Sequence, residues 1–97
     1  MTKLVISPSE KKDKKYKAVF TMENGRTKTT HFGAKGMSDY TIHKDKERRK
    51  RYRDRHQKDL RTKDPMRAGY LSYYILWGDS TSLKKNISDY KKRFKFK

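Results

Sequence analysis

The fold is decided by residues 16–32, which read YKAVFTMENGRTKTTHF. Residues 16–22 alternate between apolar and polar side chains, which is typical of a half-buried strand. The Asn24-Gly25 pair that follows favours a two-residue hairpin turn, because both residue types accept positive φ. Residues 26–32 are therefore predicted to return antiparallel to the first strand.

The predicted hairpin has one apolar face and one polar face. In the register of a two-residue turn, the facing pairs are Glu23 with Arg26, Phe20 with Thr29, and Ala18 with His31. The face expected to meet the core carries Tyr16, Ala18, Phe20 and Met22. The opposite face carries Lys17, Thr21, Lys28 and Thr30. Leu4-Val5-Ile6 predicts a further short strand, so we expect a hairpin or a three-stranded meander.

About three helices are expected after the sheet. The first is strongly basic and runs from about residues 40–44 to about Lys58, and Ser38 or Asp39 is expected to cap a short turn before it. Asp64-Pro65 predicts the start of the second helix, because Asp is a good N-cap and Pro fits the first helical position. This helix is apolar nearly all round, which is typical of a buried helix.

The last predicted helix is amphipathic, and the second is expected to end at Gly78. Leu83, Ile87, Tyr90 and Phe94 share one helical face. Together the elements predict a single small α+β domain over residues 1–97, in which a sheet packs with the helices. Residues 1–15 and 95–97 are expected to be flexible flanks.

The basic helix carries the main functional hypothesis. At about 100° per residue, five cations form one row without an acid: Lys44, Arg48, Arg51, Arg55 and Lys58. The side opposite the row carries Ile42, Tyr52, His56 and Leu60. A row of like charges repels itself, so the pattern favours a polyanionic partner, of which nucleic acid is the commonest. The alternative is a solvated helix face, balanced in part by neighbouring acids.

Composition supports the polyanion hypothesis. Lys plus Arg number 28 against 11 acids, a formal charge of +17 in 97 residues. Residues 41–63 hold eleven Lys and Arg against four acids, and residues 84–97 hold seven against one. Lys91, Lys92 and Arg93 in the second block are therefore expected to assist the binding row. Residues 64–83 are close to neutral and rich in aromatic side chains, which predicts that they form the core.

The chain has no cysteine, which excludes disulfides and thiolate metal sites. It also has no apolar run near the roughly 20 residues of a membrane span, and MTKLVISPSE lacks the long apolar stretch of a secretory signal. We therefore expect a soluble protein inside a cell or in a particle assembled there. The three His residues lack metal-ligand spacing, and no catalytic constellation is evident, so neither a metal, nor a cofactor, nor an enzyme is predicted.

Two further motifs have two interpretations each. Gly33, Lys35 and Gly36 could form a phosphate-binding turn, although a turn that needs positive φ is favoured. The aromatic side chains of residues 70–77 could stack on single-stranded bases. We favour a place for them in the core, because the chain has only 31% hydrophobic residues.

The string HFGAKGMSDYTIHKDKERRKRY, residues 31–52, resembles a family of short basic proteins of uncharacterised function. Large nucleocytoplasmic DNA viruses of algae and amoebae encode this family. Asp64-Pro65, the aromatic block through Trp77 and the closing KKRF are similar to it as well. The resemblance spans roughly residues 16–95 and brings no catalytic residues. It implies a viral setting: the virion, or the host cytoplasm or nucleus during infection.

The sequence thus predicts a non-enzymatic protein that binds nucleic acid, DNA rather than RNA, with little regard to base sequence. Genome condensation or packaging in a virus particle would be the corresponding role. The alternative is a minor capsid or scaffold protein whose basic surface docks on acidic capsid proteins or on anionic membrane. A nuclease is a third and weaker hypothesis.

Overall fold

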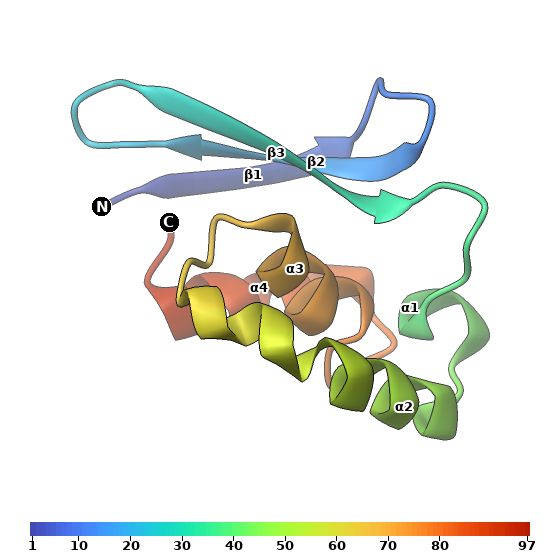
Figure 1. Ribbon diagram of the computed structural model, residues 1–97. Helices are drawn as coiled ribbons and strands as arrows, with labels where there is room; N and C mark the ends of the chain where they lie inside the picture. Colours follow the sequence, from blue (N-terminus) through green and yellow to red (C-terminus); the bar gives the residue numbers. More distant parts are fainter.

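The computed structural model describes residues 1–97 as a three-stranded antiparallel meander with the helices on one face (Figure 1). The strands are β1 (Lys3–Pro8), β2 (Lys14–Thr21) and β3 (Thr27–Ala34), in the order β1-β2-β3. The helical elements are α1 (Tyr40–His43), α2 (Lys46–His56), η1 (Gln57–Thr62), α3 (Ala68–Leu71), η2 (Ser72–Leu76) and α4 (Leu83–Phe94). The predicted α+β class and the meander are confirmed.

The β2–β3 turn has three residues instead of the predicted two. The Met22 N–H donates to the Arg26 carbonyl at 2.8 Å, and the Gly25 N–H donates to the Met22 carbonyl at 2.9 Å. Only Gly25 takes positive φ, at 84°. This is the geometry of a type I turn closed by a glycine bulge, in which Asn24 keeps an ordinary φ.

The extra loop residue shifts the predicted register by one. Phe20 faces Lys28, and Ala18 faces Thr30. Our assignment of Lys28 and Thr30 to the polar face was therefore wrong, because a shift of one residue moves side chains to the other face. Thr30 instead turns toward the helices, where its hydroxyl donates to the Met66 carbonyl at 2.7 Å.

The predicted short turn capped by Asp39 and the basic helix after it are confirmed, but the helix ends earlier than expected, at His56, and the chain continues as η1. Asp39 caps α1 by accepting from the Thr41 N–H at 2.9 Å. Lys44 then takes the left-handed conformation, with φ 59°, and ends that helix. The Asp45 side chain starts α2 by accepting from the N–H groups of Glu47 and Arg48. An Asp is a strong N-cap, so a second capping residue in this sequence restarts the helix.

The second predicted helix begins three residues later than expected. The Asp64 side chain accepts from the Met66 N–H at 2.9 Å, and its carbonyl accepts from the Arg67 N–H at 3.1 Å. Asp64 thus closes a turn that contains Pro65, and α3 starts only at Ala68. The helix continues as the π-helical η2, where the Trp77 N–H donates to the Ser72 carbonyl at 3.0 Å.

The core lies between the sheet and α3, η2 and α4. Its eleven buried side chains are Leu4, Ala18, Phe20, Phe32, Tyr40, Tyr70, Leu71, Ile75, Leu76, Trp77 and Tyr90. The expected burial of the aromatic block is confirmed for Tyr70 and Trp77, whereas Tyr73 and Tyr74 are half-buried. The predicted last helix is also confirmed: Ser82 caps α4 by accepting from the Lys85 N–H at 3.2 Å, and Tyr90 is buried.

The C-terminal residues lie beside β1, where both chain ends meet (Figure 1). Lys97 donates its N–H to the Thr2 carbonyl at 2.8 Å and accepts from the Leu4 N–H at 3.0 Å. The Phe96 ring packs on Phe20, with 5.2 Å between ring centroids. None of the helices has the length and apolar character that a membrane crossing requires.

Candidate functional site

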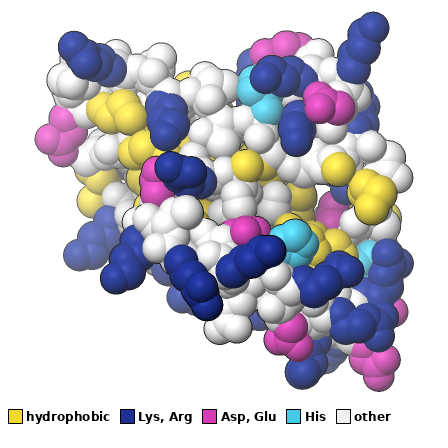
Figure 2. Space-filling model, in the orientation of Figure 1, with side chains coloured by type: hydrophobic (Ala, Val, Ile, Leu, Met, Phe, Trp, Pro, Cys, Tyr) yellow, Lys and Arg dark blue, Asp and Glu magenta, His cyan; other side chains and the backbone are white.

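A cleft of about 590 Å³ separates one end of the sheet from α2. Figure 2 shows a hollow between the sheet and the helices, with Lys and Arg side chains along its lower rim. The sheet side contributes Lys14 and Lys15, and the floor includes Gly69 and Trp77. The α2 side contributes Arg48, Arg51 and Arg55. The wall formed by α2 is therefore strongly cationic.

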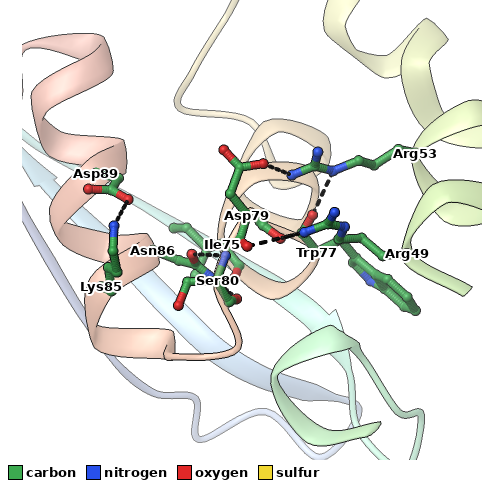
Figure 3. A network of polar contacts seen from close by, with 10 residues as sticks. Arg49, Arg53, Ile75, Trp77, Asp79, Ser80, Lys85, Asn86 and Asp89 are labelled. Carbon is green, nitrogen blue, oxygen red and sulfur yellow. Dashed lines mark hydrogen bonds and ion pairs between the residues drawn. The ribbon is translucent and has the colours of Figure 1, made fainter. Parts of the chain in front are cut away.

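Two other arginines hold α2 against the end of η2 (Figure 3). Arg53 donates from Nε to the Trp77 carbonyl at 2.8 Å and from Nη2 to Asp79 Oδ1 at 3.0 Å. Arg49 donates from Nη1 to the carbonyls of Gly78 and Asp79, at 3.3 and 3.1 Å. Carbonyls that follow the end of a helix lack helical partners, and cations stabilise them. These two guanidinium groups are consequently occupied within the protein.

A stack of rings completes the contact between α2 and the core. The Tyr52 ring lies parallel to the Trp77 indole, with 4.2 Å between centroids and 6° between planes. On its other side the His56 ring stacks at 4.1 Å. Burial raises the pKa of the Tyr52 hydroxyl, so Tyr52 stays neutral at physiological pH. The predicted helix back is therefore partly right: Tyr52 and His56 face the core, whereas Ile42 is 60% exposed.

Arg48, Arg51 and Arg55 make no ion pair and no side-chain hydrogen bond, and all three are exposed. At about 100° per residue, they point roughly 115° away from the direction in which Arg49, Tyr52, Arg53 and His56 meet the core. Arg48 and Arg55 thus project sideways over the cleft, and Arg51, at its rim, points further outward. Their donors are free for a ligand.

The two carboxylates in the cleft already have partners. Asp39 is 2% exposed, and its Oδ2 lies 2.6 Å from Lys15 Nζ. Asp59 Oδ2 lies 3.1 Å from His56 Nδ1. Because Lys15 neutralises Asp39, at most one carboxylate, Asp59, is left to offset the charge on Arg48, Arg51 and Arg55. The free cations of the cleft therefore favour an anionic ligand.

His43 lies beside this cationic wall. Its Nδ1 accepts from the Asp45 N–H at 2.9 Å, and its ring lies 5.2 Å from the Trp77 ring. Burial lowers the pKa of His43, and the charge of Arg48 lowers it further. His43 is therefore a neutral ring at pH 7 that responds to the charge on Arg48.

The structure brings together only part of the predicted binding row. Lys44 and Lys58 are exposed, but they lie outside α2 and do not line the cleft. Lys91, Lys92 and Arg93 are on α4 and do not line it either. The Arg93 guanidinium lies 4.9 Å from the centre of the Tyr74 ring. The cations of α4 form a second basic area, separate from the cleft.

The glycine turn after β3 has the positive φ that its sequence predicts: 80° at Gly33 and 88° at Gly36. Two amides in this segment donate within the protein, since the Lys35 N–H bonds to the Asp13 carbonyl and the Met37 N–H bonds to the Ala34 carbonyl. Gly33 lines the cleft, and a Cβ there would lie 2.8 Å from a Leu76 methyl. The turn is thus explained by its backbone, and its role in phosphate binding stays a prediction.

Sequence reasoning missed Lys14 and Lys15, because both fall within residues 1–15, which were expected to form a flexible flank. They belong to β2, and Lys14 pairs with Ala34 at the end of β3. No signal in the sequence marks this end of β2, because residues 9–15 are polar throughout. No group of three or more His, Cys, Asp or Glu side chains is placed to hold a metal ion. His31 lies apart, on the open face of the sheet, bonded to the Ser9 hydroxyl.

The fold and the cleft define a small α+β protein with a cationic groove beside a short basic helix. Residues 4–56 match the model of a family described as a family of unknown function (DUF5754), and the match covers more than half of the chain. The protein therefore belongs to this family. No curated protein and no solved structure matches it. The matched residues include the cations of the cleft wall, from Lys14 to Arg55.

Proposed function

We propose that this protein binds nucleic acid, with DNA as the foremost ligand, and that it does so without catalysis. One observation carries the proposal: Arg48, Arg51 and Arg55 stand unpaired along one side of α2, above a cleft whose acids are already engaged. Arginine can donate two parallel hydrogen bonds to one phosphate. This geometry favours the phosphates of a nucleic-acid backbone as the ligand over small anions in solution.

The side chains of the α2 wall favour contacts with the nucleic-acid backbone over contacts with the bases. Asn and Gln are the side chains that read adenine, and the row of cations contains neither. Contacts to phosphate position a protein on nucleic acid but carry no sequence information. Unrelated sequences of equal length should therefore bind with similar affinity.

The first test is a fluorescence-anisotropy titration with unrelated labelled DNA sequences at 50 and 200 mM salt. About four phosphate contacts predict a loss of roughly a hundredfold in affinity over that range. The triple variant Arg48→Gln, Arg51→Gln, Arg55→Gln should bind at least tenfold more weakly than the parent. Absence of binding near physiological salt would reject the proposed function.

A matched control variant distinguishes the contribution of the α2 wall to binding from the contribution of net charge. Lys3, Arg26 and Lys84 are exposed and have no side-chain partner, and none lines the cleft. Changing all three to Gln removes the same charge, yet it should leave affinity within about threefold of the parent, since charges beyond a Debye length of about 8–10 Å are screened. Equal losses in both variants would discard the wall and keep only a nonspecific charge effect.

A role in condensing a viral genome would follow from the proposed binding together with the resemblance in residues 31–52. The rival proposal is a minor capsid or scaffold protein that docks on acidic capsid proteins or on anionic membrane. Vesicles containing anionic lipid, added as competitors, distinguish the two. They should displace bound DNA poorly if the cleft is the site, because a flat membrane surface cannot enter it.

A further inference from the structure

Two of the three free arginines of α2, Arg48 and Arg55, lie on the side that faces the cleft and not on its outermost face. At about 100° per residue, the outermost face carries Glu47, Asp54 and Arg51, and Asp54 is paired with Lys50 at 3.3 Å. A helix that reads a duplex inserts its exposed face into the major groove. On α2 that face would bring two carboxylates toward the phosphates for one free arginine, Arg51, whereas Arg48 and Arg55 would remain beside the cleft.

The cleft also has the size of a strand and not of a duplex. Its volume of about 590 Å³ falls in the range of pockets that enclose a small organic ligand. The end of the sheet, at Lys14 and Ala34, forms the wall across from α2. A duplex would have to rest on the rims, out of reach of the floor, whereas one flexible strand can enter.

A second hollow extends the cleft along β3. It has a volume of about 510 Å³ and shares Asp59, Ala68 and Gly69 with the cleft. Its far end is lined by Lys28 and Arg67. Ala34 lies six positions after Lys28 along β3, a length of about 20 Å. The two hollows thus adjoin at Asp59, Ala68 and Gly69, and cations line the outer end of each.

From the placement of these cations and the volumes of the two hollows, we infer that the ligand is single-stranded nucleic acid, which runs along β3 from Arg48 toward Lys28. This inference rests on the proposed nucleic-acid binding and narrows it. Grooves of this kind follow the backbone of a single strand and occupy about 4 nucleotides or more. Oligonucleotides shorter than about 4 nucleotides should consequently bind weakly.

The test compares a 12-nucleotide oligothymidine with a DNA duplex that has the same number of phosphates, at one salt concentration. Trp77 is the only tryptophan and lies at the floor of the cleft, so its emission reports a ligand in that place. We expect at least tenfold tighter binding of the single strand, with a change in Trp77 emission. The control variant with Lys3, Arg26 and Lys84 changed to Gln should behave like the parent.

Ala34→Phe tests the groove without altering charge. Ala34 is exposed at the end of β3, so a larger side chain there fills the entrance and leaves the core untouched. It should weaken binding of the oligothymidine about tenfold and leave weak duplex binding unchanged. An equal loss for both ligands would contradict a strand-sized groove.

Three results would overturn the inference. Duplex binding as tight as single-strand binding would remove the preference and leave the proposed function standing. Binding of a polyglutamate peptide that matches and displaces the oligothymidine would assign the groove to acidic protein. Failure of both nucleic acids to bind would reject the proposed function together with this inference.

Discussion

At the residue scale, the five arginines of α2 have two different roles set by their position around the helix. Arg49 and Arg53 bond to the carbonyls that follow η2. Arg48, Arg51 and Arg55 are free, although they belong to the same run of sequence. Composition alone does not distinguish these five arginines. Only the direction in which α2 meets the core separates structural arginines from those available to a ligand.

Arg53→Gln should destabilise the fold. The change removes a charged donor from the Trp77 carbonyl and breaks the pair with Asp79. Because the Arg53 side chain is only 23% exposed, we expect a loss of about 1–2 kcal/mol in the free energy of unfolding, measured by urea titration. Lys50→Gln, which breaks an exposed pair in the same helix, should cost less than about 0.5 kcal/mol. Equal effects would refute the docking role of Arg53.

His43 should make stability depend on pH. Its pKa in the fold is lowered by burial and by Arg48, whereas the unfolded chain titrates near 6.5. As pH falls below about 6.5, the unfolded state takes up a proton first, so the free energy of unfolding falls until the folded pKa is passed. His43→Asn keeps an acceptor for the Asp45 N–H and should flatten this slope in urea titrations at several pH values.

The pKa of His43 also reports on the charge of Arg48. Arg48→Gln removes one cause of the lowered pKa, so the His43 pKa should rise toward its ordinary value in an NMR titration. Lys84→Gln, distant from His43, should leave it unchanged. A His43 pKa that ignores Arg48 would contradict the arrangement of this wall.

At the element scale, hydrophobic periodicity predicted the type and order of most elements, but not how they begin and end. The three-residue turn and the predicted two-residue turn use the same Asn24-Gly25 pair, and only tertiary pairing selects between them. The break at Lys44 depends on Asp45 acting as a cap, although Asp also fits inside an exposed helix. The late start of α3 has the same origin at Asp64.

The residues of the candidate site could be predicted from the sequence only where they lie on a single helix. Arg48, Arg51 and Arg55 were found because they recur on one side of a helix. Lys14 and the floor of the cleft come from distant segments, so their proximity depends on packing that periodicity does not reveal.

Asn86 joins η2 to α4 (Figure 3). It is buried, and its Nδ2 donates to the carbonyls of Ile75 and Ser80 at 2.8 and 2.7 Å. Asn86→Asp would place a carboxylate against both carbonyls, so we expect a loss of about 3 kcal/mol or more at pH 7. The new carboxyl should have a raised pKa, and the loss relative to the parent should therefore shrink at pH 4.5. A pH-independent loss in urea titrations would contradict this geometry.

At the scale of the whole molecule, a small core is closed by contacts between the chain ends. Phe96 packs on Phe20 and Tyr90, and Lys97 pairs with residues at the start of the chain. Phe96→Ala should lower the free energy of unfolding by about 2–3 kcal/mol, with no change in the cleft. Lys92→Ala, an exposed change on α4, should stay within about 0.5 kcal/mol. Thermal or urea unfolding of the two variants gives the comparison.

Because the net charge of the protein is +17, binding at the cleft must be distinguished from the general attraction of a polyanion to the whole molecule. A protein this basic is attracted to any polyanion, and that attraction weakens with salt whichever face is used. Weak binding alone therefore says little about Arg48, Arg51 and Arg55. The number of phosphates that a surface neutralises distinguishes binding at the cleft from this general attraction.

The most direct measurement is the slope of log affinity against log salt concentration for oligothymidine. Each lost phosphate contact on a single strand reduces the slope by about 0.7. We expect a reduction of about 2 when Arg48, Arg51 and Arg55 are changed to Gln, and a reduction below about 0.5 when Lys3, Arg26 and Lys84 are changed instead. Equal slopes in the two variants would contradict the claim that the α2 wall binds the nucleic-acid backbone.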